Sequence, residues 1–333
     1  MNKHEYERKM KARPHLVLLG AGASIAAIPN GDKHGRKTSV MNGFIDKLGM
    51  RELINDVELE TDSDNLEDIY SEIHQKPEYS EALKELDDRI FSYFSEFEIP
   101  DEPTVYDCLV LSLRKKDAIA TFNWDPLLVQ AYMRCRTLTE DVPELLFLHG
   151  NVSVGVCNEH KRGGPINSRC SVCGKSFERI PLLYPVKEKD YDSHLLIRDS
   201  WNSVRQYMER AYMLTVFGYS APKTDKSAIE LLKSAWGSIS DRNYEEIEIV
   251  DIREKEDVKK SWDDFIHSHH YSVHKSFYDT TLGKFPRRST EALFDKSMNN
   301  MWLDDSKGLR DDMNFSQLGK YFVPIIKEEL QNY

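Results

Sequence analysis

The sequence lacks any long uninterrupted apolar run, and none approaches the ~20 residues that a membrane-spanning helix requires. It also lacks an excess of positive charge, because 45 lysines and arginines face 56 acidic residues, for a net charge of -11 at pH 7. This balance argues against direct contact with nucleic acid or with an anionic membrane. The N-terminal segment 1–14 is charged and has no apolar stretch behind it, so we expect no secretory signal.

Cysteine is scarce, with five residues in the chain, and three of them lie between Cys157 and Cys173. An odd and clustered set fits a metal site in a reducing compartment better than a disulfide framework. Cys108 and Cys135 stand in apolar helical stretches and are predicted to be packing residues. With 40% hydrophobic residues to form a core, the composition predicts a soluble, acidic, cytoplasmic protein.

Short apolar runs alternate with longer amphipathic segments along most of the chain. The runs that we interpret as buried strands are 15–20, 118–124, 145–150, 213–220 and 247–252. Their continuous apolar character is typical of a sheet covered on both faces. The pattern predicts an α/β fold, a doubly wound parallel Rossmann-like sheet. We expect a helical insertion at 38–104, a small metal module at 151–180, and a charged, mostly helical extension at 253–333.

The first predicted strand runs directly into small residues, Gly20, Ala21, Gly22 and Ser24. Such a turn can cradle a pyrophosphate, since its backbone approaches the anion closely and the next helix directs N–H groups at it. The alternative is a tight turn whose glycines serve packing alone. Ile25 holds the place of the third glycine in the usual dinucleotide fingerprint, so an ordinary Rossmann dehydrogenase fits poorly.

Polar residues follow three further predicted strands. Asn123 and Asp125 stand in "TFNWD", His149 stands in "FLHG", and Gly218 and Ser220 stand in "FGYS". Each has a structural alternative: Asp125 as a helix N-cap before a proline, His149 as a satisfied histidine, Asn123 as a residue closing a turn. Their joint occurrence at strand ends favours one crevice, because ligands of parallel sheets bind at the carboxyl ends.

Two short chelating pairs, Cys157-x2-His160 and Cys170-x2-Cys173, are separated by nine residues. Three thiolates and one imidazole suit tetrahedral Zn²⁺, and four protein ligands close its shell, so the predicted site is structural. The alternative is a pair of exposed loops with free thiols. A second cluster contains only histidines and is predicted to be a solvated surface; it comprises His267, His269, His270 and His274.

The ordered set "GAGAS…IP", "TFNWD", "LHG" seven residues before a cysteine, the metal module and "GYS" resembles the sirtuin (SIR2) superfamily over residues 15–252. It is most similar to the divergent bacterial SIR2-like proteins of antiphage defence. The resemblance implies an NAD-binding domain with NAD⁺ as substrate and a zinc ribbon, although sirtuins have four cysteines there. It implies a catalytic set of Asn123, His149 and Asp125. The implied cofactor-binding residues are Gly20, Ala21, Gly22, Ser24, Pro29, Gly218, Ser220 and Asp251.

Three functions are compatible with these residues. The first is an NAD⁺ glycohydrolase, a NAD-depleting effector in which Asn123 holds the ribose or water and His149 is the general base. The second is a protein deacylase, but "ERIPLLYPVKEKDY" lacks the F-G-E stretch of the deacylase peptide groove, and "NGDKHGR" lacks their Phe-Arg pair. The third is a non-catalytic module that binds NAD⁺ or ADP-ribose. The resemblance also implies control by homo-oligomerisation or by a companion, a HerA-like ATPase or a short Argonaute.

Overall fold

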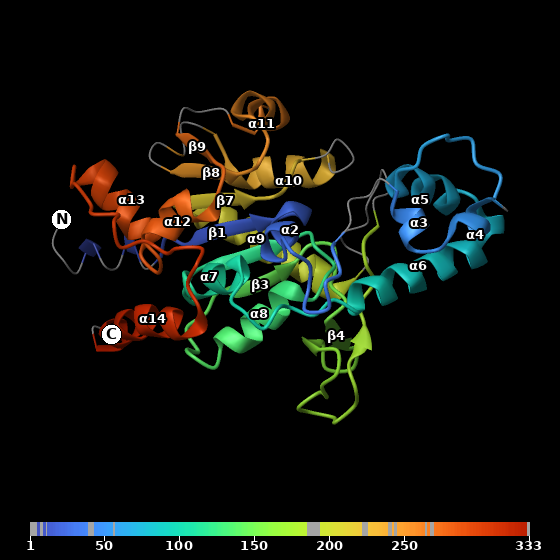
Figure 1. Ribbon diagram of the computed structural model, residues 1–333, viewed down its shortest axis with the longest axis horizontal. Coiled ribbons are helices and arrows are strands. Elements are labelled where there is room, and N and C mark those ends of the chain that lie inside the picture. Colours follow the sequence, from blue (N-terminus) through green and yellow to red (C-terminus); the bar gives the residue numbers. More distant parts are fainter. Residues whose placement is uncertain are drawn as a thin grey trace.

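The computed structural model describes residues 5–6, 9–10, 12–38, 43–55, 57–184, 194–221, 226–238, 242, 245–263, 265–266 and 270–331. Figure 1 shows a central sheet with helices on both sides and a separate group of helices at one end of the molecule. None of the helices within these residues is long and apolar enough to cross a membrane.

The central sheet has six parallel strands in the order β3-β2-β1-β7-β8-β9. The strands are β1 (His15–Leu19), β2 (Ala118–Thr121), β3 (Glu144–Phe147), β7 (Met213–Phe217), β8 (Glu246–Val250) and β9 (Tyr271–His274). Every residue of β1, β2 and β7 is buried, which explains their continuous apolar character. The predicted α/β fold with a doubly wound parallel sheet is confirmed.

The sixth strand, β9, was not predicted, and the boundary at residue 252 does not hold for the sheet. β9 pairs in parallel with β8, with Val273 opposite Ile249. Its sequence, "YSVH", is short and half-buried along its length, so it has neither the apolar run of a central strand nor a clear alternation. Part of the segment predicted as a helical extension therefore completes the central sheet.

Helices cover both faces of the sheet, and alternate residues of β1 pack against the helices on opposite faces. Val17 and Leu19 belong to the core with α2 (Ala21–Ala27), α7 (Val105–Leu111), α8 (Leu127–Cys135) and α14 (Phe315–Gln331). Leu16 and Leu18 belong to a second core with α9 (Leu195–Arg210), α10 (Lys226–Trp236) and α11 (Lys255–Trp262). The two cores lie on opposite faces of one sheet.

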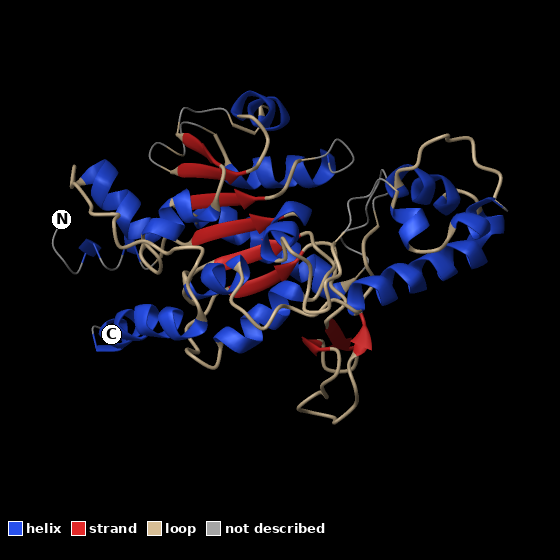
Figure 2. Cartoon of the chain, in the orientation of Figure 1, coloured by secondary structure: helices blue, strands red, loops and turns tan. Residues whose placement is uncertain are grey.

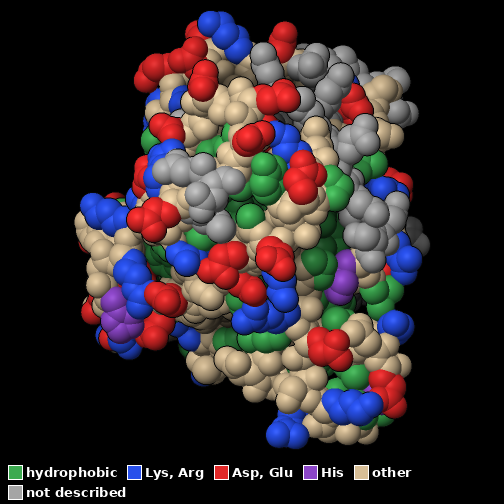
Figure 3. Space-filling model, turned by 90° about the vertical axis from the view of Figure 1, so that its right-hand side faces the viewer, with side chains coloured by type: hydrophobic (Ala, Val, Ile, Leu, Met, Phe, Trp, Pro, Cys, Tyr) green, Lys and Arg blue, Asp and Glu red, His purple; other side chains and the backbone are tan. Residues whose placement is uncertain are grey.

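A helical unit follows α2 in the chain. It consists of α3 (Phe44–Lys47), α4 (Arg51–Asn55), α5 (Leu66–His74), η1 (Pro77–Tyr79) and α6 (Ser80–Ser95). Leu86, Ile90 and Phe94 form the buried stripe of α6. Figure 2 shows the strand arrows pointing toward the side on which this unit lies. Figure 3 views the molecule from that side and shows acidic side chains interspersed with basic ones.

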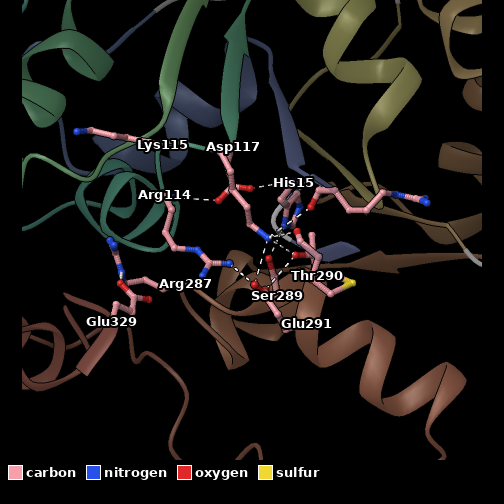
Figure 4. A network of polar contacts seen from close by, with 12 residues as sticks. His15, Arg114, Lys115, Asp117, Arg287, Ser289, Thr290, Glu291 and Glu329 are labelled. Atoms are coloured by element: carbon pink, nitrogen blue, oxygen red, sulfur yellow. Dashed lines mark hydrogen bonds and ion pairs between the residues drawn. The ribbon is translucent and has the colours of Figure 1, made fainter. Parts of the chain in front are cut away.

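The C-terminal part contains η3 (Phe277–Asp279), α12 (Thr281–Lys284) and α13 (Ser289–Met298), in addition to α14. A buried polar network joins it to the start of the sheet (Figure 4). The His15 ring contacts Ser289 Oγ at 2.7 Å and Thr215 Oγ1 at 2.8 Å, and Glu291 accepts hydrogen bonds from Arg114 and Lys116. Burial lowers the pKa of His15 to about 4, so its ring is neutral. This network lies at the amino ends of the strands, opposite the cavity described next.

Candidate active site

A cavity of about 850 Å³ lies at the carboxyl ends of the strands. Each catalytic and cofactor-binding residue predicted from the sequence lines it, namely Gly20, Ala21, Gly22, Ser24, Pro29, Asn123, Asp125, His149, Gly218, Ser220 and Asp251. These residues come from five different strand ends and lie far apart in the sequence. Arg36, in the loop after α2, does not line the cavity and donates to Glu96 Oε2 at 2.7 Å.

The turns after β1 and β7 pack directly against each other. Gly22 N–H donates to the carbonyl of Gly218 at 2.9 Å, and a Cβ on Gly22 would lie 2.8 Å from Gly218 Cα. Gly218 has a φ of +65°, and its Cβ would lie 2.2 Å from the backbone nitrogen of Ala23. Packing alone therefore requires both glycines. The same packing brings the two turns together as one wall of the cavity.

The Asn123 amide is held in a single orientation by the turn after β1. Its Nδ2 donates to the carbonyl of Gly20 at 2.9 Å and to Ser24 Oγ at 2.9 Å. Because a carbonyl can only accept, the nitrogen of the amide must face the turn. Among the residues that the structure describes, Asn123 Oδ1 accepts no hydrogen bond, so this oxygen remains available on the cavity side of a fixed amide.

Ser24 lies at the centre of a buried polar cluster. Its hydroxyl donates to Asp125 Oδ2 at 2.6 Å, and it also contacts Asn123 Nδ2 and the Tyr106 hydroxyl, the latter at 2.9 Å. A serine hydroxyl has one proton and two lone pairs, so these three contacts use its full capacity. The Ser24 hydroxyl therefore positions Asn123 and Asp125 rather than contacting a ligand.

The Asp125 carboxylate is bonded on both oxygens, although the N-cap of α8 is the next residue, Pro126. Its Oδ1 accepts the backbone N–H of Leu127, the first residue of α8, at 3.1 Å, and its Oδ2 accepts from Ser24. Burial raises the pKa of Asp125 above its ordinary value, although the hydrogen bonds from Ser24 and Leu127 oppose the shift. Asp125 thus fixes the loop that carries Asn123.

His149 follows β3 and stands against an aromatic wall of the cavity. Its ring meets the Phe122 ring edge-on, with centroids 4.9 Å apart, and Phe122 stacks on Tyr219 at 4.3 Å. The next residue, Gly150, has a φ of +80°, and a Cβ there would lie 2.4 Å from the Pro181 carbonyl oxygen. This turn and these rings fix the direction of the buried imidazole.

The far wall of the cavity carries Asp251 at the end of β8. Asp251 Oδ2 accepts from Arg253 Nη2 at 2.7 Å and from Nε at 3.0 Å, while Oδ1 accepts the Arg253 backbone N–H at 2.8 Å. Burial alone would raise the pKa of Asp251, but the hydrogen bonds from Arg253 hold it below its ordinary value. Asp251 is therefore an ionised and firmly oriented carboxylate.

Several lining residues were not predicted. Tyr106 on α7 does not line the cavity, but its hydroxyl contacts Ser24. The lining residues that sequence reasoning missed include Thr38, Asn65, Glu67, Phe94, Trp124, Arg253, Lys275, Ser276 and Tyr278. Asn65 and Glu67 of the helical unit belong to no spacing pattern, whereas Phe94 belongs to the buried stripe of α6. Arg253 and Lys275 had one available signal, since each comes shortly after a strand end, but β9 itself was not recognised.

The metal module is a three-stranded antiparallel sheet of β4 (Val154–Cys157), β5 (Arg162–Pro165) and β6 (Glu178–Arg179). The ligand atoms of Cys157, His160, Cys170 and Cys173 all lie within 4.8 Å of one another. Cys157 Sγ is 3.5 Å from His160 Nδ1 and 3.6 Å from Cys173 Sγ. The four predicted ligands therefore converge on one point.

The donor set at this point fits zinc. Hydrogen bonds from the backbone N–H groups of Cys173 and Val172 lower the pKa of Cys170 to about 6, which favours the thiolate that a metal requires. Gly174, with a φ of +70°, closes the second chelating turn. Three thiolates and an imidazole form a closed tetrahedral shell with no position for substrate, so the cluster is compatible with structural Zn²⁺.

The predicted surface cluster of histidines is wrong in part. His274 lies on β9, where its Nε2 is 3.6 Å from Glu248 Oε1 and 2.9 Å from Ser272 Oγ. The Glu248 side chain is 2% exposed, so a buried carboxylate does accompany this histidine. The sequence separates the two residues by 26 positions, and only the unrecognised pairing of β8 with β9 joins them. His267 and His269 lie outside the described residues.

The chain is thus an α/β protein with a cavity at the carboxyl edge of a parallel sheet and a separate Cys3His cluster. Solved Sir2 structures are similar to it. One, with a deacetylated p53 peptide and 3'-O-acetyl ADP-ribose, shares 14% identity over 89% of this chain and 99% of that chain, with a TM-score of 0.40. A Sir2 bound to an acetylated peptide shares 15% sequence identity over 90% of this chain and 99% of that chain, with a TM-score of 0.40. A Sir2–p53 peptide–NAD⁺ structure shares 15% identity over 90% of this chain and 99% of that chain, with a TM-score of 0.37. No protein-family model and no curated protein matches the chain.

Proposed function

We propose that the chain is a divergent SIR2-like NAD⁺ glycohydrolase that releases nicotinamide and ADP-ribose. The observation that carries the proposal is the shared cavity: the fixed amide of Asn123, the buried imidazole of His149 and the paired glycine turns all line it. An amide and an imidazole beside a backbone turn are suited to a ribose and its phosphates. The fold alone does not select this activity, so the argument rests on the site.

The order of the strands supports one direction for the bound dinucleotide. Asn123 follows β2 and Asp251 follows β8, and these strands are three positions apart in the sheet. At a strand spacing of about 4.8 Å, their ends lie roughly 14 Å apart, which is suited to an extended dinucleotide. The scissile nicotinamide–ribose bond would lie beside Asn123 and His149, the pyrophosphate over the turns after β1 and β7, and the adenosine ribose beside Asp251.

The reaction breaks the bond between the ribose C1' and the nicotinamide nitrogen, and nicotinamide leaves with the bonding electron pair. The ribose passes through an oxocarbenium-like state that water then attacks. Asn123 Oδ1 accepts a hydrogen bond from the water or a ribose hydroxyl. His149 accepts the proton that the water loses, while Ser24, Asp125 and Tyr106 keep Asn123 in place.

Water is the favoured acceptor over an acyl-lysine. The peptide-groove stretch and the Phe-Arg pair of the deacylases are absent from the sequence. In addition, Asn65, Glu67 and Phe94 of the helical unit line the cavity. These residues form a wall of the cavity on the side of the helical unit.

The proposal includes the biological setting. The enzyme acts in the cytoplasm as a NAD-depleting effector of antiphage defence, and its activity is restrained until a trigger arrives. The trigger works through homo-oligomerisation or through a companion of the HerA-like ATPase or short Argonaute type. When bound, Zn²⁺ would stabilise the module of Cys157, His160, Cys170 and Cys173, and it takes no part in the chemistry.

The proposal is tested by incubating the purified full-length chain with NAD⁺, alone and with lysate from phage-infected cells, and by measuring nicotinamide chromatographically. Asn123→Ala and His149→Ala should each lower nicotinamide release by about 100-fold or more. The matched controls are Asn299→Ala and His34→Ala, because neither residue lines the cavity. Absence of nicotinamide release under both conditions would overturn the proposal.

A further inference from the structure

A buried asparagine, Asn151, lies two residues after His149 and bonds to the loop that carries Asn123. Asn151 is 1% exposed and does not line the cavity. Its Nδ2 donates to the carbonyl of Asp125 at 2.7 Å and to the carbonyl of Asn123 at 3.3 Å. Its Oδ1 accepts the backbone N–H of Ser153 at 2.9 Å, so the nitrogen and the oxygen of the amide have fixed positions.

The backbone next to Asn151 extends this connection. Val152 N–H donates to the carbonyl of Trp124 at 3.0 Å. The three successive carbonyls of residues 123–125 therefore accept hydrogen bonds from residues 151–152. The segment between β2 and α8 lies outside regular secondary structure, and buried carbonyls in such a segment need donors from elsewhere in the chain.

These bonds join the two loops that carry the proposed catalytic side chains. Asn151 is bonded directly to the backbone of Asn123, and the two residues from His149 to Asn151 span at most about 7 Å. On its other side, the carbonyl of His149 accepts the backbone N–H of Leu183 at 2.9 Å. The Asn151 side chain therefore restrains the backbone of Asn123 relative to that of His149.

We propose that Asn151 is a positioning residue that sets the separation between the Asn123 amide and the His149 imidazole without contacting the substrate. The inference rests on the proposed function for the roles of these two side chains. Reacting groups must be held within about 0.5 Å of their productive arrangement. A misplacement of about 1 Å can lower the rate by about 100-fold, and a buried amide with both N–H groups bonded restricts such a displacement.

The first test measures kcat and KM for NAD⁺ in full-length chains. Asn151→Ala removes both donors but leaves every cavity-lining residue in the chain, so kcat should fall by about 10- to 100-fold while KM changes by less than about threefold. The matched control is Asn299→Ala, whose exposed side chain donates to Asp295 Oδ1 at 2.9 Å, and its kcat should equal that of the wild type. An unchanged kcat in Asn151→Ala, or a loss confined to KM, would overturn the inference while leaving the glycohydrolase intact.

The pH dependence of a second variant separates the loss of the donors from the loss of side-chain volume. Asn151→Asp keeps the shape of the side chain, but an ionised carboxylate donates no hydrogen bond to the two carbonyls, whereas its protonated form donates one. Its kcat relative to that of Asn151→Ala should therefore rise by about threefold or more as the pH falls from about 8 to about 5. Asp125 and His149, the neighbouring titratable groups, are common to both variants. A ratio that does not change with pH contradicts the inference.

The last test does not depend on turnover. Hydrogen–deuterium exchange, measured by mass spectrometry, should be at least about tenfold faster in residues 122–127 and 149–153 of Asn151→Ala than in the wild type, and unchanged in β8 and α11. This result supports the inference even if no nicotinamide is released and the proposed activity fails; unchanged exchange in both loops contradicts it. In the wild-type chain, Val152 and Ser153 should exchange at least about tenfold more slowly than the exposed residues 304–307. Fast exchange there contradicts the inference whether or not the variants fold.

Discussion

The Ser24→Ala substitution examines the buried cluster that holds Asn123. The change removes one oxygen that contacts Asp125, Asn123 and Tyr106. Asp125 Oδ2 then loses the hydrogen bond from Ser24, and the Tyr106 hydroxyl keeps a 3.3 Å contact with Asn123. Leaving buried polar groups unsatisfied costs about 1–3 kcal/mol each, so we expect the free energy of unfolding to fall by about 2–4 kcal/mol near neutral pH.

The pH dependence of that loss follows from Asp125. Its pKa in the folded chain is raised above the ordinary 3.8, so burying its charged form costs stability as the pH rises through the folded pKa. The Ser24 hydrogen bond offsets part of this cost only while the carboxylate is charged. The stability difference between wild type and Ser24→Ala should therefore shrink as the pH falls toward the ordinary carboxyl range.

Urea denaturation across this pH range measures the difference, with Ser95→Ala as the matched control. Ser95 is exposed on α6 and bonds only its own helix, so its loss should stay within about 0.5 kcal/mol. In the activity assay, Ser24→Ala should lower kcat by about 10- to 100-fold, since Asn123 loses one of its two short anchors. A variant with wild-type stability and wild-type kcat would refute the positioning role.

Three further outcomes are expected. Metal analysis should find one zinc per chain, lost in Cys170→Ser and retained in Cys108→Ala; zinc in both variants would contradict the assigned ligands. Gly218→Ala should destabilise the fold by several kcal/mol, since its φ is +65° and the Cβ meets Ala23, whereas Gly174→Ala meets open space and should cost less; equal unfolding temperatures would contradict this. Burial lowers the pKa of His15 to about 4, so the free energy of unfolding should fall by on the order of 3 kcal/mol as the pH falls from about 6.5 to about 4. His15→Gln should make the free energy of unfolding depend less on pH over this range, which the urea midpoints measure.

The sequence predicted best those features that are encoded in local runs. Five strands were recognised because each contains a short apolar run, and β1, β2 and β7 are buried along their whole length. The site residues at their ends followed from the rule that ligands bind at the carboxyl edge of a parallel sheet. The roles assigned to these residues remain predictions, although their convergence on one cavity is what that rule requires.

The features that were missed depend on contacts between distant segments. β9 is short and half-buried, so no apolar run marks it, and its recognition would have needed the pairing with β8. Tyr106 resembles any other core residue of α7, and only its 2.9 Å contact with Ser24 distinguishes it. Glu67 and Asn65 reach the cavity because of how the helical unit folds back, which no periodicity in their own segment reveals.

The crystal structure of the Asn123→Ala variant soaked with NAD⁺ tests the central claim most directly, because slow turnover keeps the dinucleotide intact. We predict density for one NAD⁺ extending from the nicotinamide ribose near His149 to the adenosine ribose at Asp251, with the pyrophosphate beside Gly22 and Gly218. Density in a different part of the molecule, or a dinucleotide bound with its two ends exchanged, would contradict the account.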